Sequence, residues 1–113
     1  MIVEKNINLI LKSNKLTDGK IRDKTEKYLE KLLSSRKIFL TQSCTDALEA
    51  CLSICDIGYG DEVIVPSYTF TSSANSILLN SAKPIFCDII LNKYNLDLKD
   101  VEKKITKKTK AIL

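Results

Sequence analysis

The stretch Glu62-Val63-Ile64-Val65-Pro66 decides the fold of this 113-residue chain. Its three central residues are apolar and β-branched, and no polar residue alternates with them. Such a run is typical of a strand that is buried on both faces of a parallel sheet. Pro66 closes the strand, because a proline cannot donate a backbone hydrogen bond to a neighbouring strand.

Predicted helices and strands alternate around this stretch. Apolar residues spaced three and four apart predict an amphipathic helix over 21–35, and a rougher helical spacing runs from Ile2 to Leu11. The remaining patterns predict strands at 38–40, 84–89 and 109–113, helices at 44–55, 74–80 and 101–105, a loop at 15–19 and an N-cap at Asp97. This alternation favours an α/β fold with a mostly parallel sheet between helices.

The composition suits one small domain over residues 1–113, since 44% of the chain is hydrophobic and 28% is charged. No apolar run resembles a signal peptide or reaches membrane-spanning length, so we expect a cytoplasmic protein with no membrane partner. The net charge of +4 arises from Lys99 to Lys110, which contains six lysines and two acidic residues. Because no aromatic residues or glycine-rich loop accompany these lysines, they indicate a solvated face rather than a nucleic-acid site.

Four cysteines and the absence of histidine limit the possible chemistry. No C-x-x-C pair is present, so we expect no metal site, and Ser-His-Asp and Cys-His catalysis are excluded. All four cysteines are predicted to be buried thiols, three of them on one helical face that they share with two leucines: Cys44, Cys51 and Cys55 with Leu48 and Leu52. Catalysis by this chain would therefore require a cofactor or residues that it does not contain.

The start of the helix at 44–55 is a candidate phosphate site. A helix N-terminus offers unpaired N–H groups and the positive end of the helix dipole, and the hydroxyls of Ser43 and Thr45 would add to them. The alternative is that one of these hydroxyls only caps the helix. Ligands of parallel sheets bind beyond the carboxyl ends of strands, and both Ser43–Asp46 and the loop 66–70 are predicted to follow a strand. This agreement favours the phosphate interpretation.

Three sequence motifs together resemble the DegT/DnrJ/EryC1/StrS sugar aminotransferases. They are LTQSCTDALE at 40–49, GDEVIVPSYTF at 60–70 and AKPIFCD at 82–88. The resemblance runs from Asn14 to Leu113 and is greatest to the dTDP-4-amino-4,6-dideoxygalactose transaminase branch. It implies the amino-terminal part of a large domain of aminotransferase fold type I, cut at residue 113, with pyridoxal 5'-phosphate as cofactor. The implied reaction moves an amino group from glutamate to a nucleotide-linked keto-sugar, such as a dTDP-4-keto-6-deoxyhexose, in a homodimer.

The resemblance also implies roles for individual residues. Thr45 and the backbone of Asp46 would hold the cofactor phosphate, and the ring of Phe70 would stack on the pyridine ring. Asp46 departs from the small residue common in the family, and its carboxylate would have to point away from the phosphate because two anions repel strongly at low dielectric. Tyr68 either faces the substrate or packs, and Asp88 fits a turn better than a cofactor contact.

The Schiff-base lysine, the acidic partner of the pyridine nitrogen and the small domain would lie, by resemblance, beyond Leu113. We therefore expect residues 1–113 to be inactive alone and at best marginally folded. A noncatalytic α/β interaction module is the alternative function. A nucleotide-binding Rossmann domain is disfavoured, because no G-x-G-x-x-G follows the first predicted strand.

Overall fold

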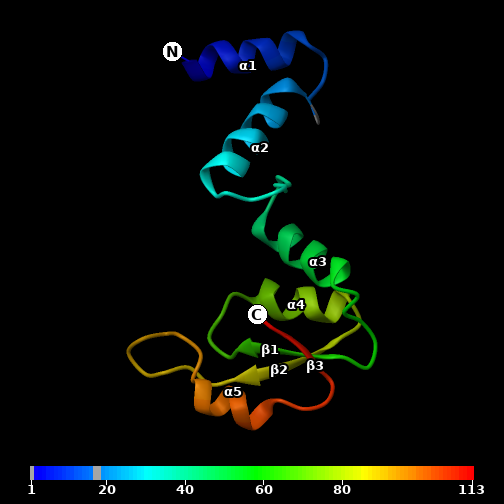
Figure 1. Ribbon diagram of the computed structural model, residues 1–113, viewed down its shortest axis with the longest axis vertical. Helices are drawn as coiled ribbons and strands as arrows, with labels where there is room; N and C mark the ends of the chain where they lie inside the picture. Colours follow the sequence, from blue (N-terminus) through cyan, green and yellow to red (C-terminus); the bar gives the residue numbers. More distant parts are fainter. Residues whose placement is uncertain (1, 17–18) are drawn as a thin grey trace. The chain divides into compact units, whose positions relative to one another are not determined.

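The computed structural model of the protein describes residues 2–16 and 19–113, and it divides into two compact units, Met1–Thr41 and Gln42–Leu113 (Figure 1). The first unit contains α1 (Ile2–Lys12) and α2 (Lys20–Leu32). The second contains α3 (Cys44–Ile54), β1 (Glu62–Pro66), α4 (Thr71–Leu79), β2 (Lys83–Cys87), α5 (Leu98–Lys104) and β3 (Thr109–Ile112). Residues 17 and 18 of the loop predicted at 15–19 lie outside the described residues. Among the described residues, no helix is long and apolar enough to cross a membrane.

The sheet of the second unit is parallel, as the sequence predicts. Its strand order is β2-β1-β3, so the β-branched stretch forms the central strand. Glu62 to Pro66 pairs in continuous register with Lys83 to Cys87, and the pairing with β3 shifts register between Glu62 and Val63. The predicted α/β fold class is therefore confirmed.

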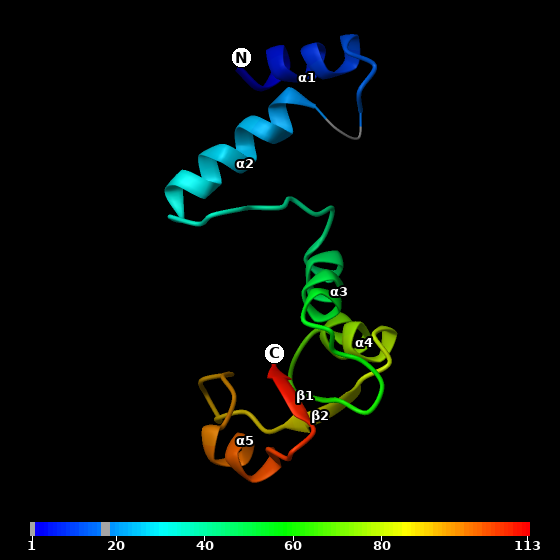
Figure 2. The same ribbon diagram turned by 45° about the vertical axis from the view of Figure 1, so that its right-hand side comes forward.

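Side chains of β1 enter two cores, one on each face of the sheet. Val63 and Val65 are fully buried with Leu52 of α3 and Ile77 of α4. Ile64, which points the opposite way, is buried with Cys87 and with Val101 of α5. Figure 2 shows the same division, with α3 and α4 on one side of the sheet and α5 on the other. Burial on both faces is the physical reason that β1 carries no alternating polar residues.

The predicted strand at 38–40 is wrong, because this segment forms no strand. Its backbone N–H groups instead donate to carboxylates of α2: Ile38 N to Glu30 Oε1 at 3.3 Å, and Leu40 N to Glu26 Oε1 at 3.4 Å. Phe39 is 75% exposed. A strand needs a neighbouring strand to satisfy its amides, and the described part of the first unit offers only helices.

The prediction of four buried thiols is correct only for Cys87. Cys44, Cys51 and Cys55 are exposed, although they lie on the helix that was expected. Leu52, which was predicted to share the face of these cysteines, does enter the core and packs toward α4 and the sheet. Helical spacing places residues on one face, but it does not determine how much of that face is covered.

Candidate functional site

Ser43 is the N-cap of α3. Its backbone is extended (φ −147°, ψ 162°), and its hydroxyl accepts a hydrogen bond from the N–H of Asp46 at 3.1 Å. Its carbonyl accepts the first helical hydrogen bond, from Ala47 N at 3.2 Å. The capping interpretation therefore holds for Ser43, and one of the amides at the helix start is already occupied.

The donors left at this helix start belong to Cys44 and Thr45. Their two backbone N–H groups and the Thr45 hydroxyl have no hydrogen-bond acceptor among the residues that the structure describes. Thr45 itself is half-buried. Three donors at the positive end of a helix dipole suit an anion with several oxygens.

Asp46 is exposed in the first turn of α3. An acidic side chain there interacts favourably with the helix dipole when no anion is bound. Its own N–H is engaged by Ser43 Oγ, so a phosphate could take that donor only by displacing or sharing with the hydroxyl. The backbone N–H groups of Cys44 and Thr45 could consequently donate to a phosphate without displacing the Ser43 hydroxyl.

Phe70 precedes α4 as its N-cap residue, and its side chain is 76% exposed. The ring does not pack into either core, so among the described residues it is available to a ligand. The loop before it is fixed by two contacts: Ser67 N donates to Cys87 O at 2.8 Å, and the hydroxyls of Thr69 and Ser73 lie 2.9 Å apart. No hydrogen bond or ring contact within the described residues joins Phe70 to Thr45 or Asp46.

The two candidate segments differ in their relation to the sheet. The loop holding Phe70 follows the carboxyl end of β1, as expected for a ligand site in a parallel sheet. Ser43–Asp46 follows no strand, since 38–40 is irregular. The phosphate interpretation was favoured because both segments were expected to follow a strand. In the structure, only the loop that holds Phe70 does so.

Tyr68 packs against Tyr94, a residue that the sequence did not single out. The ring centroids are 5.6 Å apart and the ring planes are tilted by 33°. Tyr94 lies in the turn between β2 and α5, where Ile89 and Leu96 form an antiparallel bridge. In the sequence, Tyr94 stands within a polar, turn-forming run, Asn92-Lys93-Tyr94-Asn95. Such a run predicts a turn, but it does not identify which ring Tyr94 would contact.

A charged cluster fastens α5 to the end of β2. Asp100 Oδ2 accepts from Asp88 N at 2.7 Å, from Lys104 Nζ at 2.7 Å and from the Cys87 thiol at 3.2 Å. The hydrogen bond from Asp88, then those from Lys104 and Cys87, lower the pKa of Asp100 to about 2. Burial, reinforced by Asp100, raises the pKa of the Cys87 thiol, so it stays protonated. Asp88 thus contributes its backbone N–H to this cluster.

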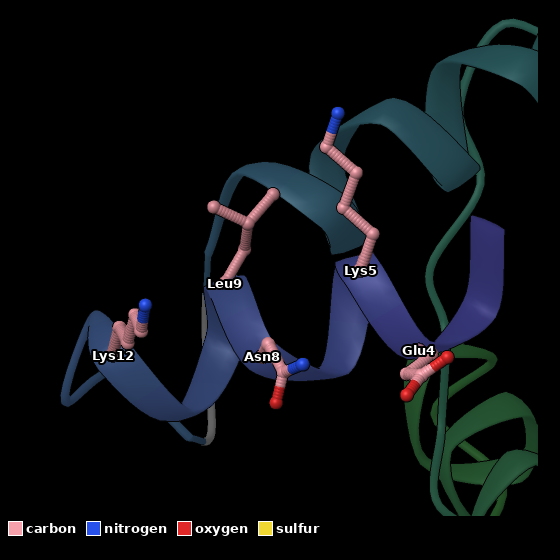
Figure 3. Close-up of a pocket in the computed structure, with 5 residues that line it drawn as sticks. All are labelled: Glu4, Lys5, Asn8, Leu9 and Lys12. Atoms are coloured by element: carbon pink, nitrogen blue, oxygen red, sulfur yellow. The ribbon is translucent and has the colours of Figure 1, made fainter. Parts of the chain in front are cut away.

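The surface also carries a hollow in the first unit, at a distance in sequence from these candidates. It lies on α1, and Figure 3 shows its five lining side chains spread along the helix, with Lys5 and Leu9 on one side and Asn8 on the other. They do not converge on one point, so the hollow offers no set of groups that could hold a ligand together.

Comparison with solved structures places the fold among pyridoxal-phosphate-dependent aminotransferases. Spr1654 of Streptococcus pneumoniae in its PLP form, described as a sugar aminotransferase, superposes with a TM-score of 0.90 at 34% identity, over 96% of this chain and 28% of that chain. NtdA of Bacillus subtilis with bound cofactor PMP gives a TM-score of 0.85 at 32% identity, over 97% of this chain and 26% of that chain.

The chain belongs to the DegT/DnrJ/EryC1/StrS aminotransferase family, whose model matches residues 3–113. A curated relative, the dTDP-3-amino-3,6-dideoxy-alpha-D-galactopyranose transaminase of Aneurinibacillus thermoaerophilus, is 34% identical over 98% of this chain and 31% of its own length. GDP-perosamine synthase of Vibrio cholerae is 36% identical over 84% of this chain and 26% of its own length. The resemblance drawn from the motifs is confirmed, and the family uses pyridoxal phosphate. The chain spans about three tenths of the length of these relatives.

Proposed function

We propose that this chain forms one wall of the active site of a sugar-nucleotide aminotransferase that uses pyridoxal 5'-phosphate. The observation that carries the proposal is the family match over residues 3–113, joined to donors at the start of α3 that have no acceptor among the described residues. The named products and substrates of relatives include dTDP-, GDP- and UDP-linked sugars. The proposed reaction moves an amino group from glutamate to a nucleotide-linked keto-sugar, with a dTDP-4-keto-6-deoxyhexose as the first substrate to test.

The residues present fit the cofactor. The amides of Cys44 and Thr45 and the Thr45 hydroxyl would hold the phosphate, and Asp46 N would join them if Ser43 released it. Phe70, with its ring exposed, would lie against the pyridine ring. When bound, the cofactor supplies an electron sink for the carbon that loses a proton. The chain's part is to bind and orient it.

In this proposal, residues 1–113 are the amino-terminal part of a large domain that acts in the cytoplasm as a homodimer. Glutamate and the nucleotide-sugar would be its small-molecule partners. The essential lysine is proposed to lie outside residues 1–113, since none of the lysines between 99 and 110 fits its motif. The chain by itself is therefore proposed not to transfer amino groups.

The test is to express residues 1–113 alone and again beside the separately encoded carboxyl-terminal remainder of a close relative. Amino transfer from glutamate to a dTDP-4-keto-6-deoxyhexose is then followed by mass spectrometry of the amino sugar. We expect turnover only when both pieces are present, and none when the added piece lacks its lysine. Turnover by the chain alone would contradict the proposal. A soluble, monodisperse chain with no affinity for pyridoxal phosphate would favour a noncatalytic interaction module instead.

A further inference from the structure

Tyr68 and Tyr94 form an exposed aromatic pair that the proposed phosphate and ring contacts do not use. Their rings are 5.6 Å apart and tilted by 33°, and the side chains are 67% and 66% exposed. A pair that filled either core of the described chain would be buried. Here about two thirds of each tyrosine is left facing solvent.

The pair lies where a ligand of a parallel sheet is expected. Tyr68 is in the loop that follows β1, and Tyr94 is in the turn that follows β2, so both come from the carboxyl edge of neighbouring parallel strands. Figure 1 shows these two connections leaving the sheet on the same side. Phe70 ends the same loop as Tyr68, two residues later.

The backbone that presents Tyr94 is unfavourable. Tyr94 has φ 58°, which lies in the left-handed region of backbone conformation. Residues other than glycine rarely adopt this region, and bulky residues do so least of all. The turn is held by Tyr94 N and Lys93 N, which donate to Ile90 O at 3.2 Å and 3.1 Å, and by Ile90 N, which donates to Asn95 O at 2.8 Å. These bonds fix the backbone of the turn that carries Tyr94. Strain of this kind is found where a side chain is held ready for a ligand.

We propose that the Tyr68–Tyr94 pair is a stacking surface for the nucleobase of the nucleotide-sugar substrate. Every nucleobase has a flat aromatic face, and stacking on tyrosine is tolerant of base identity. The inference rests on the proposed function, because it assumes that the substrate carries a nucleotide. It assigns the recognition of that part of the substrate to this chain.

The test is a titration with dTDP of the 113-residue chain paired with the unlabelled carboxyl-terminal remainder described above, with the tyrosine rings of this chain alone labelled with ¹³C for NMR. The chain has four tyrosines and no tryptophan, so each ring can be followed, and Tyr28 and Tyr59 serve as internal controls. We expect the signals of Tyr68 and Tyr94 to shift together while the control rings do not move. UDP and GDP should produce the same pattern, whereas pyrophosphate and glucose 1-phosphate, which lack a base, should not.

Substitution separates stacking from loop packing. Tyr94→Leu should weaken dTDP binding roughly fivefold to a hundredfold, the range for loss of one stacked aromatic, while Tyr94→Phe should retain it. Equal shifts with glucose 1-phosphate, or unmoved rings at millimolar dTDP, would overturn the inference, and both can be read on the unmodified chain. A parallel titration with pyridoxal phosphate, followed by absorbance, tests the proposed function separately. Cofactor binding without any dTDP response would leave that function standing and refute the stacking surface.

Discussion

At the start of α3, the Ser43 hydroxyl and a bound phosphate would compete for one donor, the amide of Asp46. Thr45 is free of this competition, because its amide and hydroxyl have no acceptor within the described part of the chain. The motif alone predicted Thr45 and Asp46 as phosphate-site residues, and this stays a prediction. It could not show which hydroxyl caps the helix, since Ser and Thr are both favoured caps and the choice depends on backbone geometry.

We predict that Thr45→Val weakens the binding of pyridoxal phosphate when the chain is paired with the carboxyl-terminal remainder described above. Losing one hydrogen bond to a charged group costs about 1.5–3 kcal/mol, or roughly tenfold to a hundredfold in affinity. Absorbance titration measures the change, and Thr45→Ser, which keeps a hydroxyl, is the matched control. Unchanged affinity in Thr45→Val would remove Thr45 from the phosphate site.

Phe70 is predicted to contact the cofactor ring. Its 76% exposure means that Phe70→Leu deletes little buried surface, so the Tm of the chain should change little. In the paired protein, the same substitution should lower cofactor affinity and alter the absorbance spectrum of the bound cofactor. Leu78→Ala, on α4 and 57% exposed, is the control for a general loss of apolar surface. If Phe70→Leu affects only the Tm, the ring has a packing role.

Among the elements, α5 is attached to the end of β2 by the Asp100 carboxylate, which accepts from Cys87 and Asp88, and by Lys104 Nζ, which donates to Phe86 O and to Asp100. The pKa of Asp100 is lowered from 3.8 to about 2 in the folded chain. A lowered pKa contributes stability that is fully present above the unfolded value and is lost as the pH falls through the folded value. The attachment should therefore weaken as the pH falls from 3.8 toward 2.

We predict that Asp100→Asn lowers the Tm at pH 7 and that its difference from the unmodified chain disappears as the pH approaches 2. Thermal unfolding followed by circular dichroism between pH 7 and pH 2 measures this. Glu102→Gln removes a charge from an exposed position of the same helix and should have little effect at any pH. If the two substitutions changed the Tm equally at pH 7, the hydrogen bonds of Asp100 would contribute no more to stability than an exposed charge on the same helix.

The elements also show what local sequence can and cannot predict. β1 was predicted with its observed bounds, because burial on both faces leaves a continuous apolar run that is visible within five residues. The segment 38–40 has a similar apolar character, but it lies in a unit whose described elements are helices, and no strand pairs with it. Whether a short apolar run becomes a strand is thus decided by a partner that is distant in sequence.

At the scale of the whole molecule, the sheet of the described chain has β2 and β3 as its edges. Unpaired strand edges present open N–H and C=O groups to other chains. Large apolar side chains are also exposed over the helices of the second unit, with Ile54 at 79%, Leu79 at 70% and Leu98 at 70%. The relatives, of which this chain spans about three tenths, have much more chain with which to cover such surfaces.

We predict that the 113-residue chain, when expressed alone, forms oligomers or aggregates, because exposed apolar surface and open strand edges both promote association. Light scattering over a concentration series measures the average mass. Ile54→Lys with Leu79→Lys places two charges on exposed positions of α3 and α4, and it should raise the monomer fraction without disturbing the buried core. Coexpression with the carboxyl-terminal remainder should do the same for a different reason, since it would cover the surface instead of charging it. The contrary result is a chain that stays monomeric at high concentration without either change. That result would mean that each unit buries enough of its own apolar surface to be stable alone. It would favour an independent module over one wall of an aminotransferase site.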